Sequence, residues 1–475
     1  MGEMSVSTEV LVLGGGPGGY AAAFRAAQRG LDTTVVTDEA DGLGGVCLLR
    51  GCIPSKALLE MTGRISLVRA ASEAGIHFSE PEVDLGALQD WTDDVVDALV
   101  SGLDALAEGR GIRVLEGRGT FESPSRLRVE GAEVSVVDFE HAVIATGSRP
   151  VDLPDTPFGG PVWDSERALE MEEIPDTLLV VGAGYVGLEM GTVYARLGSA
   201  VTVVETMERI LPMVDVELTA PLRSHLDELF DDIRLGSGVE SLEGDEDGVE
   251  VVLDDGTRER FDAALVAVGR RPRTESLGLE PIGVELDGKG YIPVDETRRT
   301  GVDGVFAVGD VTGGKRLAHE AMREGKVAAD VIAGEPAAFD ARAVPAVVYT
   351  DPQIAWCGDL AEEDRSDGAE VDVARFPLRA SGRARTMGAG AADGLVKLVT
   401  EVGSGRVLGA GFTGRHVESL VTEATLAMEM GATAEDLALT IHPHPTLSEG
   451  LGEAAEDILG LPTHFSSSDE AEEDR

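Results

Sequence analysis

Residues 9–38 read EVLVLGGGPGGYAAAFRAAQRGLDTTVVTD, and this stretch decides the fold. An apolar, β-branched run ends in a glycine turn, small residues with helical spacing follow, and a second strand-like run closes the segment. Residues 177–205, TLLVVGAGYVGLEMGTVYARLGSAVTVVE, repeat this order. Each segment predicts one βαβ unit, so we expect an α/β protein with two Rossmann-like dinucleotide-binding domains.

Both segments carry the spacing GxGxxG. The glycines are Gly14, Gly16 and Gly19 in the first segment and Gly182, Gly184 and Gly187 in the second. The first glycine permits the turn, the second lets the backbone approach a pyrophosphate, and the third lets the helix pack on the strand. The phosphates would meet the positive end of the helix dipole. A doubly wound sheet that binds mononucleotides or no nucleotide is the weaker alternative.

An acidic residue after the second strand of such a unit selects the nucleotide. Glu205 stands there in the second segment, where a carboxylate can bond a ribose 2′-hydroxyl and repel a 2′-phosphate, which favours NAD over NADP. In the first segment the residue at the same distance from the last glycine of the motif is Thr37. Asp38, the next residue, could bond the ribose only if the pattern were shifted by one position. Two dinucleotide sites in one chain suggest an electron relay.

Composition limits the partners. The 475 residues include 87 acidic and 39 basic side chains, and the net charge of -48 repels nucleic acid and anionic membranes. No apolar run reaches the ~18 residues of a membrane span, and the N-terminus lacks the features of a signal peptide, so a cytoplasmic location is expected. Because such a charge opposes compaction in dilute salt, we favour a halophilic protein over an ordinary acidic one.

Later segments extend this organisation. HAVIATGSRP (141–150) and ALVAVGRRPR (264–273) each read as a β-rich run that stops at a glycine turn. GVFAVGDVTG reads as a buried strand ending in Asp310, and residues 317–334 read as a helix whose first turn can offer N–H groups to an anionic ring edge. Strand-like pieces from about Val344 and a later helix predict a separate α+β domain, followed by a disordered acidic tail.

Two of the three cysteines, Cys47 and Cys52, lie in LGGVCLLRGCIPSKA (43–57). A structural disulfide, half of a metal site and a redox-active dithiol are the possible explanations. A zinc site needs about four ligands and none lies nearby, so no metal is expected, and a reducing compartment disfavours a structural bridge. Gly51 and Pro54 supply the break that a bridge at this spacing needs. A redox pair is favoured, whereas Cys357 reads as an inert core thiol.

These residues carry a resemblance to a known family. GGVCLLRGCIPSKALL, ATGSRP, GAGYVGLE, AVGD and HPHPTLSEG resemble the class I pyridine nucleotide-disulfide oxidoreductases over residues 8–460. GCIPSKALL with HPTLSE favours the branch that oxidises dihydrolipoamide over the glutathione reductases, and mercuric reductases carry a C-terminal cysteine pair that is missing here. The resemblance implies an FAD-binding domain in 1–150 and 271–343, an NAD-binding domain in 151–270, a dimerisation domain in 344–465 and the tail in 466–475.

The resemblance also implies roles for single residues. Cys47 is expected to exchange with dihydrolipoamide, and Cys52 to lie against the flavin. His444 is expected to deprotonate the substrate thiol, held by Glu449, and to act on the disulfide of the other subunit. A histidine suits this task because the nucleophile is the thiolate, whose free pKa lies above neutrality. Lys56, paired with Glu189, is expected near flavin N5, where a cation stabilises incoming electron density.

Further residues are expected to hold the cofactors. The FAD set is Gly14, Gly16, Gly19, Asp38, Lys56, Thr146, Gly147, Asp310, Ala318 and His319, and the NAD set is Gly182, Gly184, Gly187, Glu205 and Gly269. His319 is expected to contribute its backbone more than its ring. The chain departs from the family pattern at Val46, Leu49 and Thr37, where Thr, Asn and Glu are usual.

The resemblance predicts an enzyme that oxidises protein-bound dihydrolipoamide to lipoamide and reduces NAD+, with FAD and a Cys47–Cys52 redox disulfide. A homodimer is part of this mechanism. The partners would be lipoyl domains of a 2-oxoacid dehydrogenase complex or of the glycine-cleavage H protein. Two alternatives remain open, namely a paralogue that reduces another disulfide or acceptor and a non-catalytic flavoprotein scaffold subunit.

Overall fold

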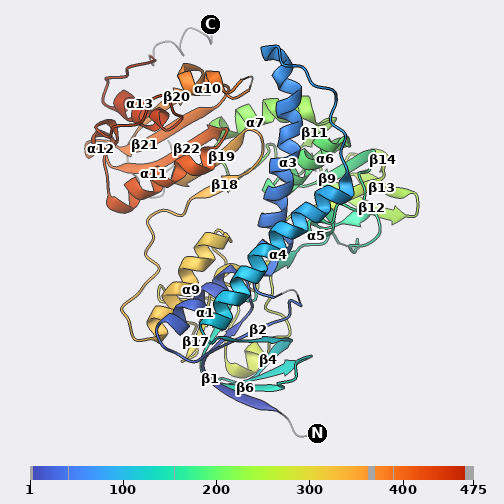
Figure 1. Cartoon of the computed structure of the whole chain (residues 1–475), viewed down its shortest axis with the longest axis vertical. Helices are drawn as coiled ribbons and strands as arrows, with labels where there is room; N and C mark the ends of the chain where they lie inside the picture. The colour runs from blue at the N-terminus through green and yellow to red at the C-terminus, as the bar shows by residue number, and fades with distance from the viewer. Residues whose placement is uncertain are drawn as a thin grey trace.

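The computed structural model describes residues 4–40, 42–154, 156–361, 368, 370–388 and 390–465. The predicted acidic tail, 466–475, lies outside the described residues. Figure 1 shows the N-terminal sheet at one end of the molecule, the second Rossmann-like unit to one side and the C-terminal unit at the other end. The long helices α3 (Cys52–Ala70) and α4 (Leu85–Gly109) run between the first two units.

The first sheet has the strand order β3-β2-β1-β6-β5-β4, and β17 also pairs with β6. The strands are β1 (Ser5–Leu13), β2 (Thr33–Thr37), β3 (Arg113–Glu116), β4 (Arg118–Ser123), β5 (Arg126–Glu130), β6 (Val136–Ile144) and β17 (Val305–Ala307). The central pairs are parallel, and β5 and β4 form an antiparallel edge. Strand β17 returns to this sheet after the second unit, which closes the interrupted first unit.

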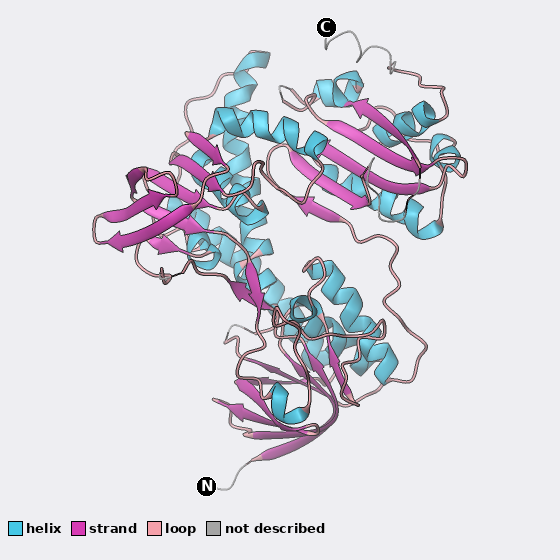
Figure 2. Ribbon diagram, turned by 180° about the vertical axis from the view of Figure 1, so that it is seen from behind, coloured by secondary structure: helices cyan, strands magenta, loops and turns pink. Residues whose placement is uncertain are grey.

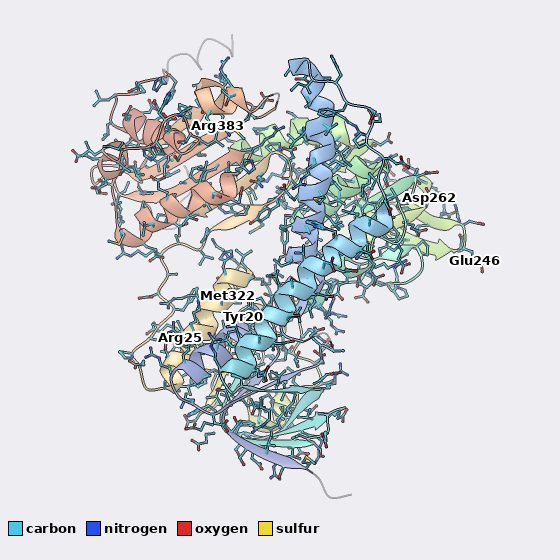
Figure 3. All side chains as sticks on the ribbon, in the orientation of Figure 1. Tyr20, Arg25, Glu246, Asp262, Met322 and Arg383 are labelled. Atoms are coloured by element: carbon cyan, nitrogen blue, oxygen red, sulfur yellow. The ribbon has the colours of Figure 1, made fainter. Side chains whose placement is uncertain are left out.

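Helices α1 (Pro17–Gln28) and α9 (Ala318–Ile332) lie side by side on this sheet (Figure 1). A Cβ atom on Gly325 would lie 2.2 Å from the carbonyl oxygen of Gly18, so only glycine allows this approach. Figure 3 shows Tyr20 and Arg25 on α1 near Met322 on α9. Apolar side chains of both helices share one core cluster with β1 and β2, as expected for a parallel sheet with covered faces.

The second sheet is parallel and has the order β11-β10-β9-β15-β8. Its strands are β8 (Val162–Trp163), β9 (Thr177–Val181), β10 (Ala200–Glu205), β11 (Asp232–Leu235) and β15 (Ala263–Val266), and an antiparallel sheet of β12 (Val239–Asp245), β13 (Gly248–Leu253) and β14 (Arg258–Phe261) adjoins it. Helix α6 (Tyr185–Leu197) connects β9 to β10, and α5 (Ser165–Leu169) and α7 (Val216–Leu229) complete the unit. A pair of short strands, β7 (Ser148–Pro150) and β16 (Arg270–Pro272), joins the chain segments that enter and leave this unit.

The C-terminal unit is an antiparallel sheet with helices beside it, as Figure 2 shows from behind. The strand order is β18-β19-β22-β21-β20, with β18 (Ala346–Val348), β19 (Gln353–Gly358), β20 (Val371–Pro377), β21 (Leu395–Glu401) and β22 (Val407–Gly414). The helices are α10 (Gly382–Thr386), α11 (Val417–Met430), α12 (Ala434–Ala438) and α13 (Glu449–Ile458). The structure confirms the predicted α/β class with two Rossmann-like units and a C-terminal α+β unit, while the domain limits at single residues stay predictions.

The cysteine segment folds as two helices with a break. Helix α2 (Gly45–Arg50) stops at Gly51, whose φ of -150° and ψ of -109° interrupt the helix, and α3 begins at Cys52. A Cβ atom on Gly51 would lie 2.7 Å from the carbonyl oxygen of Val46, so the tight turn requires glycine. Although α3 and α4 are long, no helix of the described residues is both long and apolar enough to cross a membrane.

Candidate active site

A cavity begins at the first glycine loop, passes the end of β2 and the cysteine segment, and reaches the start of α6. Many predicted residues line it: Gly14, Gly16, Asp38, Cys47, Cys52, Lys56, Thr146, Gly147, Glu189, Asp310 and Ala318. They come from both Rossmann-like units and from the start of α9. The fold therefore gathers into one space residues that are far apart in the sequence.

The first glycine loop has the geometry that a dinucleotide needs. A Cβ atom on Gly14 would lie 2.3 Å from the carbonyl oxygen of Ala145, and one on Gly19 would lie 1.9 Å from that of Gly14. Helix α1 begins at Pro17, after the N-cap Gly16, which lines the cavity. The free N–H groups and the dipole at this helix start can therefore bind a phosphate that lies in the cavity.

The second glycine loop repeats this geometry. A Cβ atom on Gly182 would lie 2.7 Å from a backbone oxygen of the neighbouring strand segment, and one on Gly187 would lie 2.2 Å from the oxygen of Gly182. A Cβ on Gly184 would meet nothing within 4 Å, so the surface there is open to a ligand. Glu205, at the end of β10, accepts the N–H of Ala183 at 2.8 Å. The loop and its acidic residue thus lie together, as NAD recognition requires.

Gly269, the last member of the predicted NAD set, follows β15 and has a φ of +136°. A Cβ atom there would also meet nothing within 4 Å, although the positive φ still favours glycine. The described residues that line the cavity around Cys47 and Cys52 include no member of the predicted NAD set. The predicted NAD set therefore lies outside this lining, although Tyr185 and Val186 of the second glycine loop reach the cavity.

Both cysteines are free thiols in this structure, with Cys47 half-buried and Cys52 exposed to the cavity. A hydrogen bond from Cys47, opposed by burial and helped by Lys56, lowers the pKa of Cys52 to about 7. The same hydrogen bond and burial raise the pKa of Cys47. These opposite shifts favour ionisation of Cys52 over ionisation of Cys47.

Lys56 and Glu189 join α3 to α6. Lys56 Nζ donates to Glu189 Oε2 at 2.6 Å, and the Glu189 side chain is 3% exposed. Burial opposes the charge of Lys56, yet Glu189 raises the pKa of Lys56 above its usual range. Tyr349, which sequence reasoning missed, donates its N–H to Glu189 Oε1 at 2.9 Å. The segment VVYTDP carries no motif that points to this contact, because the partners are distant in sequence.

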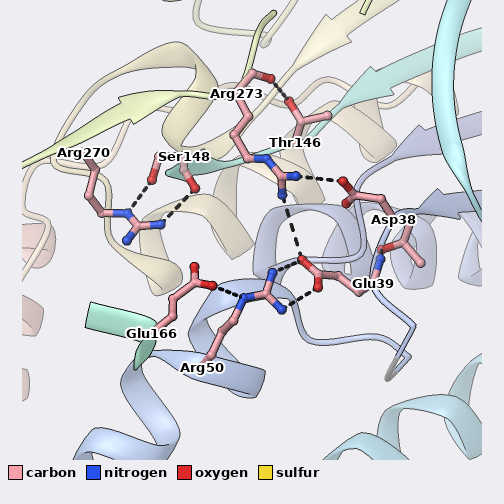
Figure 4. Close-up of polar contacts among 9 residues, drawn as sticks. Asp38, Glu39, Arg50, Thr146, Ser148, Glu166, Arg270 and Arg273 are labelled. Atoms are coloured by element: carbon pink, nitrogen blue, oxygen red, sulfur yellow. Dashed lines mark hydrogen bonds and ion pairs between the residues drawn. The ribbon is translucent and has the colours of Figure 1, made fainter. Parts of the chain in front are cut away.

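Two carboxylates after β2 are held by arginines (Figure 4). Arg273 Nη2 donates to Asp38 Oδ2 at 2.7 Å, and Arg50 Nη1 donates to Glu39 Oε2 at 2.6 Å. Thr37 Oγ1 accepts the N–H of Glu39 at 3.2 Å. All five residues line the cavity, and Asp38 is paired with an arginine there, while its predicted contact with a ribose stays a prediction. LLRGC and GRRPR were the available signals for the arginines, and sequence reasoning did not use them.

Asp310 is held next to the cavity by Ser148, whose Oγ donates to Asp310 Oδ2. Arg270 Nε donates in turn to Ser148 Oγ at 2.8 Å (Figure 4). Burial raises the pKa of Asp310. Ala318 begins α9 at the cavity wall, whereas Nε2 of His319 is 2.7 Å from the carbonyl oxygen of Pro345 and the described lining does not include His319.

His444 and Glu449 form a separate pair in the C-terminal unit. His444 Nδ1 lies 2.7 Å from Glu449 Oε1, and Glu449 Oε2 accepts the N–H of Thr446 at 2.7 Å. Against the effect of burial, these two partners lower the pKa of Glu449. The His444 side chain is 73% exposed, and neither residue belongs to the described lining of the cysteine cavity. A carboxylate on Nδ1 leaves Nε2 of an exposed imidazole free to accept a proton.

The sequence profile of the pyridine nucleotide-disulphide oxidoreductases matches residues 8–325, and that of the dimerisation domain of the same family matches residues 344–455. Dihydrolipoyl dehydrogenase of Halobacterium salinarum is 45% identical over 98% of this chain and 99% of the relative, and that of Thermus scotoductus is 48% identical over 96% and 98%.

Solved structures agree with these relatives. The crystal structure of LpdA from Mycobacterium tuberculosis superposes with a TM-score of 0.88 at 29% identity, covering 95% of this chain and 99% of that one. The HOCl-induced flavoprotein disulfide reductase RclA from Escherichia coli gives a TM-score of 0.84 at 27% identity, covering 94% and 99%. Both sequence relatives bear the name dihydrolipoyl dehydrogenase, and the chain belongs to the pyridine nucleotide-disulphide oxidoreductases.

Proposed function

We propose that this chain is an NAD-dependent dihydrolipoyl dehydrogenase that oxidises protein-bound dihydrolipoamide to lipoamide. The reaction converts a dithiol and NAD+ into a disulfide, NADH and a proton. The observation that carries the proposal is the asymmetric pair Cys47 and Cys52 in a cavity between two glycine loops. Relatives named dihydrolipoyl dehydrogenase at 42% to 48% identity support the same substrate.

The residues of the cavity fit FAD. The first glycine loop would bind the pyrophosphate at the start of α1, Asp310 would bond the ribityl chain, and Ala318 would offer its N–H to the ring. When bound, FAD carries the electron pair from the thiol pair to NAD+. The Lys56 ammonium, fixed by Glu189, supplies a positive charge at the cysteine end of the cavity.

Thiol–disulfide exchange starts from the Cys47–Cys52 disulfide. A substrate thiolate attacks Cys47 and forms a mixed disulfide, and Cys52 leaves as a thiolate that the positive charge of Lys56 stabilises. The second substrate thiol then displaces Cys47, so that lipoamide leaves and the enzyme keeps two electrons as a dithiol. A low pKa at the leaving sulfur speeds the first step because a more stable thiolate leaves faster.

His444 removes the proton from the substrate thiol in this proposal. Because His444 lies in the C-terminal unit and outside the described cavity lining, it would serve the cavity of a second subunit in a homodimer. The match of residues 344–455 to a dimerisation domain supports this arrangement. We place the enzyme in the cytoplasm, with lipoyl domains of a 2-oxoacid dehydrogenase complex or of the glycine-cleavage H protein as partners.

The decisive test is NADH formation from dihydrolipoamide by the purified protein and by Cys52→Ser. The parent protein should reduce NAD+, and the variant should bind flavin yet lose turnover by at least a factor of about 10³, in line with the loss of a covalent catalyst. A variant that forms NADH at the parent rate would contradict the role of the dithiol. A parent that reduces another disulfide but not lipoamide would support a paralogous function.

A further inference from the structure

Tyr349 reaches the candidate active site from the C-terminal unit. It directly follows β18, and its backbone N–H donates to Glu189 Oε1 at 2.9 Å. The centre of its ring lies 4.7 Å from Lys56 Nζ, within the range of a cation–π contact. One residue therefore contacts both members of the ion pair that borders Cys52.

The two contacts fix the ion pair from different directions. Glu189 uses one oxygen for Lys56 and the other for the N–H of Tyr349, so its buried carboxylate has a partner on each side. The Lys56 ammonium in turn lies between that carboxylate and the ring face. Because α3, α6 and the segment after β18 meet here, the position of the ammonium depends on how the C-terminal unit packs against the other two.

We propose that Tyr349 is a positioning residue for the thiol pair, whose ring and backbone N–H keep the Lys56 ammonium where it stabilises the Cys52 thiolate. The inference rests on the proposed function, in which Cys52 is the thiol next to the flavin. It adds the C-terminal unit of the same chain to the groups that control the redox thiols.

The electrostatic balance at Cys52 gives the direction of the effect. The ionisable groups that act on Cys52 or are acted on by it are Cys47, Lys56, Tyr185, Glu189 and Tyr349. Lys56 lowers the pKa of Cys52, whereas Glu189 raises it. If the ring is removed, the ammonium can move away along the carboxylate, while the negative charge of Glu189 stays in place. The pKa of Cys52 should therefore rise.

The test is a pH titration of the reduced holoenzyme. Ionisation of Cys52 is followed by the long-wavelength absorption of a thiolate that lies against the flavin. The variants are Tyr349→Met and Tyr349→Leu, which remove the ring and keep an apolar side chain, and Tyr349→Phe, which keeps the ring. In the ring-free variants the midpoint should rise by roughly half a unit or more from that of the parent, as expected for the loss of a partly buried cation–π contact. Tyr349→Phe should keep the parent midpoint.

Trp356→Leu is the matched control. Trp356 lies on the adjacent strand β19, and it packs against the same core cluster as Tyr349. Loss of packing against this cluster should lower thermal stability in both cases, but only Tyr349→Met and Tyr349→Leu should move the midpoint of the Cys52 titration. A ring-free variant that titrates like the parent, or a Trp356→Leu protein that shifts equally, would overturn the inference. A parent enzyme without the absorption band would overturn the proposed function and this inference with it.

Discussion

Replacing Glu189 with Gln should separate the stability of the site from the reactivity of its thiols. The amide oxygen can still accept the N–H of Tyr349, so the change removes a charge and leaves the shape. Lys56 Nζ is 2.6 Å from the carboxylate, and a Coulomb attraction over that distance is worth roughly 6 kcal/mol at an effective dielectric constant of about 20. Removing one partner of a buried pair costs about 3–5 kcal/mol.

The net cost should lie below that range. The Lys56 side chain is 28% exposed, so water can solvate part of the charge that the variant leaves unpaired. We expect a loss of roughly 2–3 kcal/mol, which lowers the melting temperature of a domain of 150–250 residues by roughly 4–12 °C. The assay is thermal unfolding by circular dichroism in molar KCl, where a partly buried pair is screened less than a surface pair.

Although Glu189→Gln should make the protein less stable, it should make the Cys52 thiol easier to ionise. The negative charge of Glu189 raises the pKa of Cys52. Loss of the carboxylate should therefore lower the pKa of Cys52 below about 7, and the fraction of thiolate at pH 6.5 should increase. A titration midpoint that rises in Glu189→Gln would refute the reasoning.

A surface pair provides the control for this experiment. Arg223 and Asp227 lie one turn apart on α7 at 2.8 Å, and their side chains are 33% and 49% exposed. Asp227→Asn removes one charge from this pair and should cost less than about 0.5 kcal/mol. If Asp227→Asn lowered the melting temperature as much as Glu189→Gln, the effect would come from net charge and not from the buried contact.

Two more predictions concern the proton acceptor and the net charge. His444→Gln should slow reduction of the enzyme by dihydrolipoamide by a factor of about 10²–10⁴ in stopped-flow experiments, while reoxidation by NAD+ changes little; equal slowing of both half-reactions would contradict a role as thiol base. The net charge of -48 should make the inactivation half-life at fixed temperature longer in 2 M than in 0.1 M KCl, since the Debye length of ~10 Å at 0.1 M falls to ~3 Å at 1 M. Equal half-lives would argue against adaptation to high salt.

Local sequence patterns were enough to predict the two glycine loops and the cysteine segment. In each spacing the third glycine encodes a close approach to the first within one βαβ unit, and Gly51 encodes the break between two consecutive helices. The contacts of Asp38 with Arg273 and of Glu39 with Arg50 could not be predicted in this way, because they join side chains of separate segments whose distance depends on how those segments pack. Tyr349 is the clearest such case, since nothing in VVYTDP marks it as a neighbour of Lys56.

The asymmetry of the thiol pair shows how local and distant effects combine. Cys52 is the first residue of a long helix, so the helix dipole favours an anion there, and Lys56 lies one turn further along the same helix. Both effects are visible in CIPSK. Lys56 alone, however, could turn toward solvent, and burial would oppose its charge; Glu189 holds it with its charge retained, and the ring of Tyr349 limits its remaining freedom. The sequence thus selects which sulfur becomes the thiolate, and the packing of three units determines how strongly.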